Sequence, residues 1–172
     1  MLRRNCCGGI NLRINKYIAW GAVVIWMGLI FAFSHQPGGQ SAELSSGVTE
    51  LVLSTVESIL PIEFDRDSVH YVIRKGAHFS VYFVLGILVL HALRRSGFSG
   101  LRSVLFSLGI CVIYAITDEV HQLFIPGRSG EVTDVLIDSA GAGVGICLYV
   151  IGSSARHRWK KRKREKSKSL VA

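Results

Sequence analysis

The chain has 172 residues, of which 49% are hydrophobic and 19% charged, with a mean hydropathy of +0.38 and a formal net charge of +8 at pH 7. It is too apolar for an average soluble domain of this length, and it is long enough for one compact unit. Apolar segments recur at about the 20-residue length that a helix needs to cross the hydrocarbon core of a bilayer. We therefore expect an all-α integral membrane protein.

The first apolar segment, at about residues 17–33, contains no charged residue. The basic residues before it resemble the start of a signal peptide. However, the apolar core is long, and the sequence FAFSHQP lacks the small-x-small pattern of a cleavage site. We interpret 17–33 as a retained transmembrane helix and 1–16 as a basic N-terminus.

The segment after the first span shows a second helical pattern. Between residues 44 and 60 apolar residues recur at helical spacing, whereas Glu43, Glu50 and Glu57 repeat every seven residues on another face. This pattern predicts an amphipathic helix outside the membrane, between the first and second spans. It would lie at the membrane interface, fold back as a lid, or pack on the outer end of the bundle.

Three further spans follow, at about residues 76–93, 103–124 and 132–152. The four spans form one expected transmembrane domain, 17–152, followed by a basic tail at 153–172. The sequence AGAGVG lies inside the fourth span with no strand before it, so it does not indicate a nucleotide-binding loop. Its Gly141-x-x-x-Gly145 spacing predicts a small-residue face for close helix packing.

The distribution of charge predicts the orientation of the chain. Sixteen of the 20 Lys and Arg residues lie before the first span, between the second and third spans, or after the fourth. Eleven of the 12 Asp and Glu residues lie on the other side. Because cytoplasmic loops collect Lys and Arg, we expect both termini to be cytoplasmic in a bacterial inner membrane. A basic tail next to a span favours contact with anionic lipid headgroups over nucleic-acid binding.

This topology brings polar residues of all four spans to the same depth, near the outer surface. Asp118, His121 and Gln122 share one helical face, with Glu119 about a quarter turn away, and Asp134 and Asp138 share another. A charged residue costs about 2.5 to 3.5 kcal/mol at the centre of a membrane helix on insertion scales, and less near the interface. We therefore expect these residues to face inward and pair with the cations Arg74, Lys75 and Arg128.

Three purposes fit such a cluster: a structural ion-pair network, a binding site at the outer face, and a catalytic site. In the catalytic interpretation His121 or His78 is the general base and Asp118 orients it. The remaining candidates bind ligand: Lys75, Glu119, Gln122, Arg128 and Asp134. Metal-ligand residue types are present, but no established ligand spacing occurs, so the sequence assigns no metal ligand and identifies no cofactor.

Several of these segments together resemble the VanZ-like family, which is named for a protein associated with resistance to the glycopeptide teicoplanin. The resemblance covers about residues 33–145 and is carried by SHQPG, RKGAHFSVYFVLG and YAITDEVHQLFIPGRSGEVTDVLIDSAGAGVG. It implies a transmembrane bundle and supports by match the residues Lys75, His78, Asp118, Glu119, His121, Gln122, Arg128 and Asp134. Asp138 departs from the pattern, because many relatives have Asn there.

We therefore expect a protein that binds or acts on an extracytoplasmic envelope component. The candidates are a lipid headgroup, a cell-wall precursor, and a lipophilic glycopeptide such as teicoplanin. The alternative is a non-catalytic membrane protein whose cluster is structural. A small transporter or dimeric channel comes third, because the cytoplasmic halves of the spans carry no charge to line a path.

Overall fold

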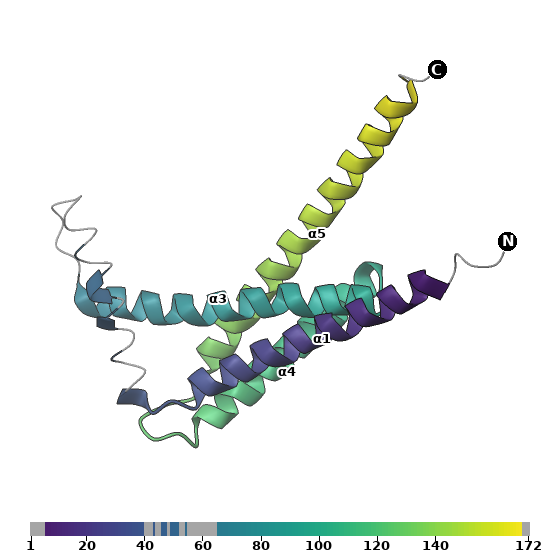
Figure 1. Cartoon of the computed structure of the whole chain (residues 1–172). Helices are drawn as coiled ribbons and strands as arrows, with labels where there is room; N and C mark the ends of the chain where they lie inside the picture. Colours follow the sequence, from purple (N-terminus) through teal and green to yellow (C-terminus); the bar gives the residue numbers. More distant parts are fainter. Residues whose placement is uncertain are drawn as a thin grey trace.

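The computed structural model describes residues 6–39 and 65–169, with positions 43, 46, 47, 49–51 and 54 between them. Its long elements are the helices α1 (Cys6–Ser34), α3 (Arg66–Arg95), α4 (Gly100–Gln122) and α5 (Val132–Ser169), shown in Figure 1. No strand occurs in these described ranges, which confirms the predicted all-α class. Glu43 and Leu51 have helical backbone, but most of the amphipathic helix predicted at 44–60 lies outside the described residues.

Among the described residues, four helices are long and apolar enough to cross a membrane: Lys16–Ser34, Arg66–Arg95, Gly100–Gln122 and Val132–Lys163. Large apolar side chains cover their outer faces; Ile25 is 68% exposed, Ile113 65% and Leu148 52%. Such exposure is costly in water, whereas it is favourable when the surrounding solvent is lipid. The protein is therefore a membrane protein with four membrane-spanning helices.

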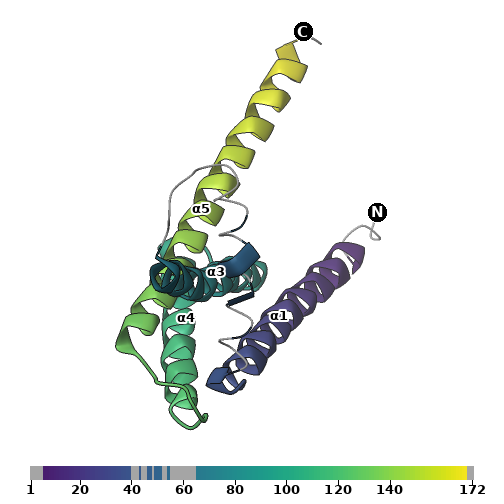
Figure 2. The same cartoon turned by 90° about the vertical axis from the view of Figure 1, so that its left-hand side faces the viewer.

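Helix α3 is the centre of the bundle and contacts each of the other three long helices. Figure 2, in which α3 is seen nearly end-on, shows α1 on one side of it and α5 on the other. The buried core follows α3, and includes Tyr82, Leu85 and Val89, each 0% exposed. Because α3 touches every other long helix, its side chains face all three of them.

Helices α3 and α5 cross with their backbones almost in contact, as the small-residue pattern predicts. A Cβ atom on Gly141 would lie 2.3 Å from the carbonyl oxygen of Phe79, and one on Gly145 would lie 2.2 Å from that of Phe83. From the other helix, a Cβ on Gly86 would lie 2.5 Å from the oxygen of Ala142. These distances confirm the predicted packing face of Gly141 and Gly145.

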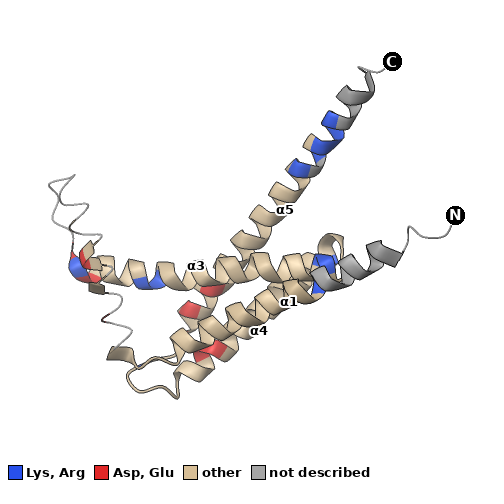
Figure 3. Ribbon diagram, viewed as in Figure 1, with Lys and Arg blue, Asp and Glu red and all other residues tan. Residues whose placement is uncertain are grey.

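Two helices extend beyond the expected spans. Helix α3 begins at Arg66, well before the expected start of the second span near residue 76, with Asp65 as its N-cap. Helix α5 continues without a break to Ser169, because the basic tail after Gly152 contains no Pro or Gly and is rich in Lys and Arg. Figure 3 shows the Lys and Arg residues along this far part of α5.

Candidate functional site

The polar residues expected to cluster do lie at one end of the bundle. This end is formed by the C-terminal ends of α1 and α4, the N-terminal third of α3 and the first turns of α5. Figure 3 shows acidic residues on the facing turns of α4 and α5 there. We call this group the polar cluster; its members are Lys75, His78, Asp118, Glu119, Gln122, Arg128, Glu131, Asp134 and Asp138.

A tight turn between α4 and α5 holds the outer edge of the cluster. The amide of Arg128 donates to the carbonyl oxygen of Ile125 (3.2 Å), and Gly127 has a positive φ of 74°. With Pro126 before it, this is the geometry of a type II turn, which requires glycine at its third position. Gly38, just after α1, donates its amide to the carbonyl oxygen of Pro126 (3.1 Å), so the turn is fastened to α1.

Arg128 connects the turn to two helices. Its Nε donates to the carbonyl oxygen of Gln36 (3.2 Å) and its Nη2 to that of Phe33 (3.1 Å), so two of its donors hold the end of α1. Its Nη1 donates to Oε1 of Gln122 on α4 (3.2 Å). Burial lowers the pKa of Arg128, and the nearby Arg74 lowers it further. Three of the five N–H donors of the guanidinium are thus used to position the protein itself.

Glu119 is held in place from both sides. Gln122, which is fully buried, donates from Nε2 to Oε1 of Glu119 (3.2 Å). The backbone amide of Glu131, at the start of α5, donates to Oε2 of Glu119 (3.0 Å). The carboxylate of Glu119 therefore ties the end of α4 to the beginning of α5.

A buried ion pair joins α3 to α5. Lys75 Nζ contacts Asp134 Oδ1 in a short charge-assisted hydrogen bond, and it lies 2.8 Å from Glu131 Oε2. Asp134 is 1% exposed, whereas the side chain of Glu131 is 45% exposed. The hydrogen bond from Lys75, followed by one from Thr133, lowers the pKa of Glu131. This group resembles the structural pairing expected for charges in a membrane.

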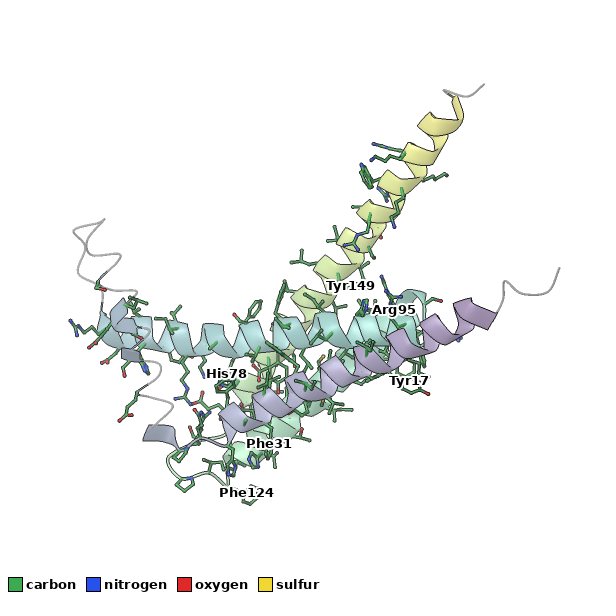
Figure 4. The ribbon with its side chains drawn as sticks, in the orientation of Figure 1. Tyr17, Phe31, His78, Arg95, Phe124 and Tyr149 are labelled. Atoms are coloured by element: carbon green, nitrogen blue, oxygen red, sulfur yellow. The ribbon has the colours of Figure 1, made fainter. Side chains whose placement is uncertain are left out.

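Asp138 lies one turn further along α5 and is paired differently. His78 projects from α3 toward the first turns of α5, as Figure 4 shows, and its Nδ1 lies 3.4 Å from Oδ1 of Asp138. The contact does not have hydrogen-bond geometry, and neither oxygen of Asp138 has a hydrogen-bond partner within the described part of the chain. Asp138 is nevertheless 0% exposed. Such a group is costly to bury and is rare in folded proteins.

Two further polar atoms near Asp138 also lack a hydrogen-bond partner among the described residues. They are Oδ1 of Asp118, a residue that is 4% exposed, and the hydroxyl of the fully buried Tyr82. The ring of Tyr82 packs against that of Tyr114, whose own hydroxyl donates to the carbonyl oxygen of Met27 (2.6 Å). The interior of the cluster therefore contains a concentration of unsatisfied oxygen atoms.

His121 belongs to a separate group at the surface. Its Nε2 lies 3.2 Å from Nδ1 of His35, and its ring stacks on that of Phe31 with centroids 4.5 Å apart. Phe31 lies in the last turn of α1, and His35 directly follows that helix; Figure 4 labels Phe31 at this end of the bundle. Of the residues proposed to be catalytic, His78 and Asp118 thus line the buried cluster, whereas His121 contacts the end of α1.

The family model described as VanZ/LLP1 matches residues 19–153 of this chain. The chain belongs to the VanZ/LLP1 family. The match includes the whole polar cluster, most of the first span, all of the second and third, and the fourth up to residue 153. No curated protein and no solved structure gave a match.

Within this VanZ-like chain, the sequence interpretation did not give Asp138 a role. Its one-turn spacing from Asp134 indicated that it faces inward, which is correct. The two carboxylates differ in the side chain of α3 that each contacts. Asp134 contacts Lys75, and Asp138 contacts His78. That difference depends on how α3 and α5 cross and is not visible in the spacing along α5.

Proposed function

We propose that this VanZ-like membrane protein binds, or acts on, an extracytoplasmic component of the bacterial envelope through the polar cluster. The observation that carries the proposal is the carboxylate of Asp138, which contacts His78 but accepts no hydrogen bond from the described residues, together with Oδ1 of Asp118, which accepts none from them either. A purely structural network would pair these atoms, because each unsatisfied buried acceptor costs about 1 to 3 kcal/mol. Unmet hydrogen-bonding capacity of this kind is typical of functional sites.

The charge distribution supports an outward-facing cluster. The acidic end of the bundle is opposite the end where Arg94 contacts Ser153 and the basic part of α5 begins. Because Lys and Arg concentrate on the cytoplasmic side, the polar cluster would face the outside of the inner membrane. The ligand classes at that level are lipid headgroups, cell-wall precursors and lipophilic glycopeptides.

The rim of the cluster suits a polar headgroup. The side chain of Glu131 is 45% exposed and that of His78 is 14% exposed, so both can be reached from outside the buried core. His78 beside Asp138 also has the arrangement of a general base and the carboxylate that orients it. The cluster thus supports binding of a headgroup and proton transfer to or from one of its hydroxyl groups.

The structural alternative is supported by a different set of contacts. Lys75 with Asp134, and Glu119 with Gln122 and Arg128, form paired groups that link α3, α4 and α5. These contacts hold the helices together, so a structural role is sufficient to explain these residues. It does not account for Asp138 and Asp118.

Native mass spectrometry of the protein, purified from bacterial membranes in a mild detergent, tests the proposal. We expect a co-purified lipid or lipid-linked precursor on the wild-type protein and on the matched control Asp67→Asn, an exposed acid in the first turn of α3. Asp118→Asn should reduce the occupancy by about tenfold or more, the effect of losing roughly 1.4 kcal/mol of binding. Equal occupancy in all three proteins would contradict the proposal.

Labelling of a single cysteine tests the proposed orientation independently. Ser129 is exposed in the turn between α4 and α5, so Ser129→Cys in a background without the native cysteines reports which side the turn occupies. We expect a membrane-impermeant maleimide to label it in intact cells. Labelling only after the cells are opened would place the cluster on the cytoplasmic side.

A further inference from the structure

We propose that His78, Glu119 and Asp138 bind one divalent transition-metal cation of the Zn²⁺ or Mn²⁺ class. The site rests on the proposed function for its purpose, since the metal would lie inside the same polar cluster. When the metal is bound, His78 is a ligand and not the general base. The existence of the metal site is a separate question, which binding of the metal alone decides.

The three residues come together from three helices: α3, α4 and α5. Each offers one ligand atom, and these atoms all lie within 4.8 Å of one another. A tetrahedral cation with bonds of about 2.1 Å separates its ligand atoms by about 3.4 Å. The distance of 3.4 Å between His78 Nδ1 and Asp138 Oδ1 already has this value. The ligand atom of Glu119 lies no more than 4.8 Å from the other two, so it would approach by up to about 1.4 Å to complete the set.

The unpartnered carboxylate of Asp138 is an independent indication of a ligand. Its exposure is 0%, and both of its oxygens lack a hydrogen-bond partner among the described residues, so their lone pairs are free. Oδ1 of the buried Asp118 is free as well. A bound cation would satisfy such oxygens without requiring a hydrogen-bond donor that the surrounding helices do not supply.

The net charge of the buried part of the cluster indicates that the bound cation is divalent. Four carboxylates are buried, those of Asp118, Glu119, Asp134 and Asp138. The cations that hydrogen-bond within the cluster are Lys75 and Arg128. When these six groups are ionised and His78 is neutral, as a metal ligand must be, two negative charges stay uncompensated among the buried carboxylates, a region that is expensive for any unpaired charge. Glu131, which also contacts Lys75, is exposed to solvent and lies outside this buried group. One divalent cation would neutralise both negative charges.

The donor set indicates which cations fit. An imidazole nitrogen favours first-row transition metals over Mg²⁺ and Ca²⁺, which prefer oxygen alone, and two carboxylates suit Zn²⁺ and Mn²⁺. Gln122 and the amide of Glu131 hold the carboxylate of Glu119 in place, as residues behind a metal ligand commonly do. Three protein ligands leave a coordination position open, which an oxygen atom of a headgroup would fill.

The test uses the full-length protein, purified in detergent without a histidine tag and stripped of metal with a chelator. Co²⁺ is added as a spectroscopic probe, because its visible absorption reports a low-symmetry coordination site. Zn²⁺ and Mn²⁺ retained after desalting are then measured by elemental analysis. The variants are Asp138→Asn, His78→Gln and the matched control His70→Gln, on the same helix outside the cluster.

We expect about one bound cation per wild-type chain and the same for His70→Gln. The apparent affinity should fall by about 100-fold or more in Asp138→Asn and His78→Gln, because each loses a direct ligand rather than a supporting contact. Added Zn²⁺ should also raise the unfolding temperature of the wild-type protein, which is a measurement that needs no variant. The proposal would be overturned if the wild-type protein retained no cation. It would also be overturned if His70→Gln lowered the affinity as much as Asp138→Asn and His78→Gln do.

The two proposals fail in different ways. If wild-type protein binds no metal but Asp118→Asn still loses its co-purified lipid, the metal site is wrong and the proposed function stands. If the metal binds but no envelope component is retained by any variant, the proposed function is wrong and the metal site stands.

Discussion

Lys75 and His78, one turn apart on α3, contact Asp134 and Asp138, one turn apart on α5. Lys75 forms a close ion pair with Asp134, whereas His78 lies 3.4 Å from an Asp138 carboxylate that accepts no hydrogen bond from the described residues. On two consecutive turns of α5, therefore, Asp134 has a hydrogen-bond donor on α3, whereas Asp138 has none among the described residues. We interpret the first as part of the framework and the second as part of the site.

Removing the framework cation should destabilise the bundle strongly. In Lys75→Met the buried Asp134 loses its ion pair, and breaking a buried pair from one side costs about 3 to 5 kcal/mol. The unfolding temperature in detergent, followed by intrinsic fluorescence, measures the loss. The double variant with Asp134→Asn removes the stranded charge and should recover most of the stability. If the double variant is no more stable than Lys75→Met, the ion pair is not the cause.

Adding a methyl group at Gly141, where α3 and α5 cross, should destabilise the bundle. In Gly141→Ala the new Cβ would lie 2.3 Å from the backbone oxygen of Phe79, which can move only if the helices separate. We expect a loss of about 1 to 3 kcal/mol, as for other overpacked positions. Gly143→Ala is the matched control on the same helix, since no atom lies within 4 Å of its Cβ position. Equal unfolding temperatures for the two variants would show that the helices are not in close contact.

The attachment of α1 to the turn between α4 and α5 depends on a second close backbone contact. A Cβ on Gly38 would lie 1.9 Å from the carbonyl oxygen of Gly127, whereas one on Gly39 meets nothing within 4 Å. Gly38→Ala should therefore release the turn, and hydrogen exchange should accelerate at residues 33–38 and 125–128. Gly39→Ala should leave exchange unchanged. Slow exchange in both variants would mean that Arg128 alone holds the two segments together.

The N-cap of α3 should give a small, pH-dependent stabilisation. Oδ2 of Asp65 accepts hydrogen bonds from Ser68 Oγ (2.6 Å) and Ser68 N (3.2 Å), which lower the pKa of Asp65. A carboxylate whose pKa is lowered by folding stabilises the protein above its unfolded pKa, about 3.9 for Asp, and stops doing so as the pH falls through the folded value.

The variant Asp65→Ala tests this contribution. Its deficit in unfolding temperature should be constant from pH 7 down to about 5 and should shrink at lower pH. Asp65→Asn is the control, because its amide oxygen can cap the helix in any protonation state of the carboxylates. A deficit in Asp65→Ala that is independent of pH down to 3 would show that the charge of Asp65 has no part in the cap.

Much of this architecture follows from the sequence. The helical class, the four spans and the glycine face of α5 could be predicted because membrane helices have a fixed length and period. The inward direction of Asp118, Gln122, Asp134 and Asp138 also follows from helical spacing. Glu119 is buried as well, although it points about a quarter turn away from Asp118. This is explained by the position of α4, which packs against α3 and α5 and so has a wide buried face.

The pairing of the charges could not be predicted. Lys75 and Asp134 are 59 residues apart along the chain, and the register of α3 against α5 selects which side chain of α3 each carboxylate meets. The start of α3 was also hidden, because Arg66, Asp67, Arg74 and Lys75 make its first turns too polar to resemble a span. His121 shares a helical face with Asp118, yet it contacts His35 because the end of α1 covers that part of α4.

The central claim is that Asp138 is kept for a ligand, at a cost in stability, whereas Asp134 is kept for the fold. The most direct test compares the unfolding temperatures of Asp138→Asn and Lys75→Met, both measured without added metal or lipid. Because Asp138→Asn removes an unpaired buried charge, it should be as stable as the wild-type protein or more stable, while Lys75→Met should be much less stable. A loss of stability in Asp138→Asn as large as that in Lys75→Met would contradict the claim, and would make the whole cluster a structural network.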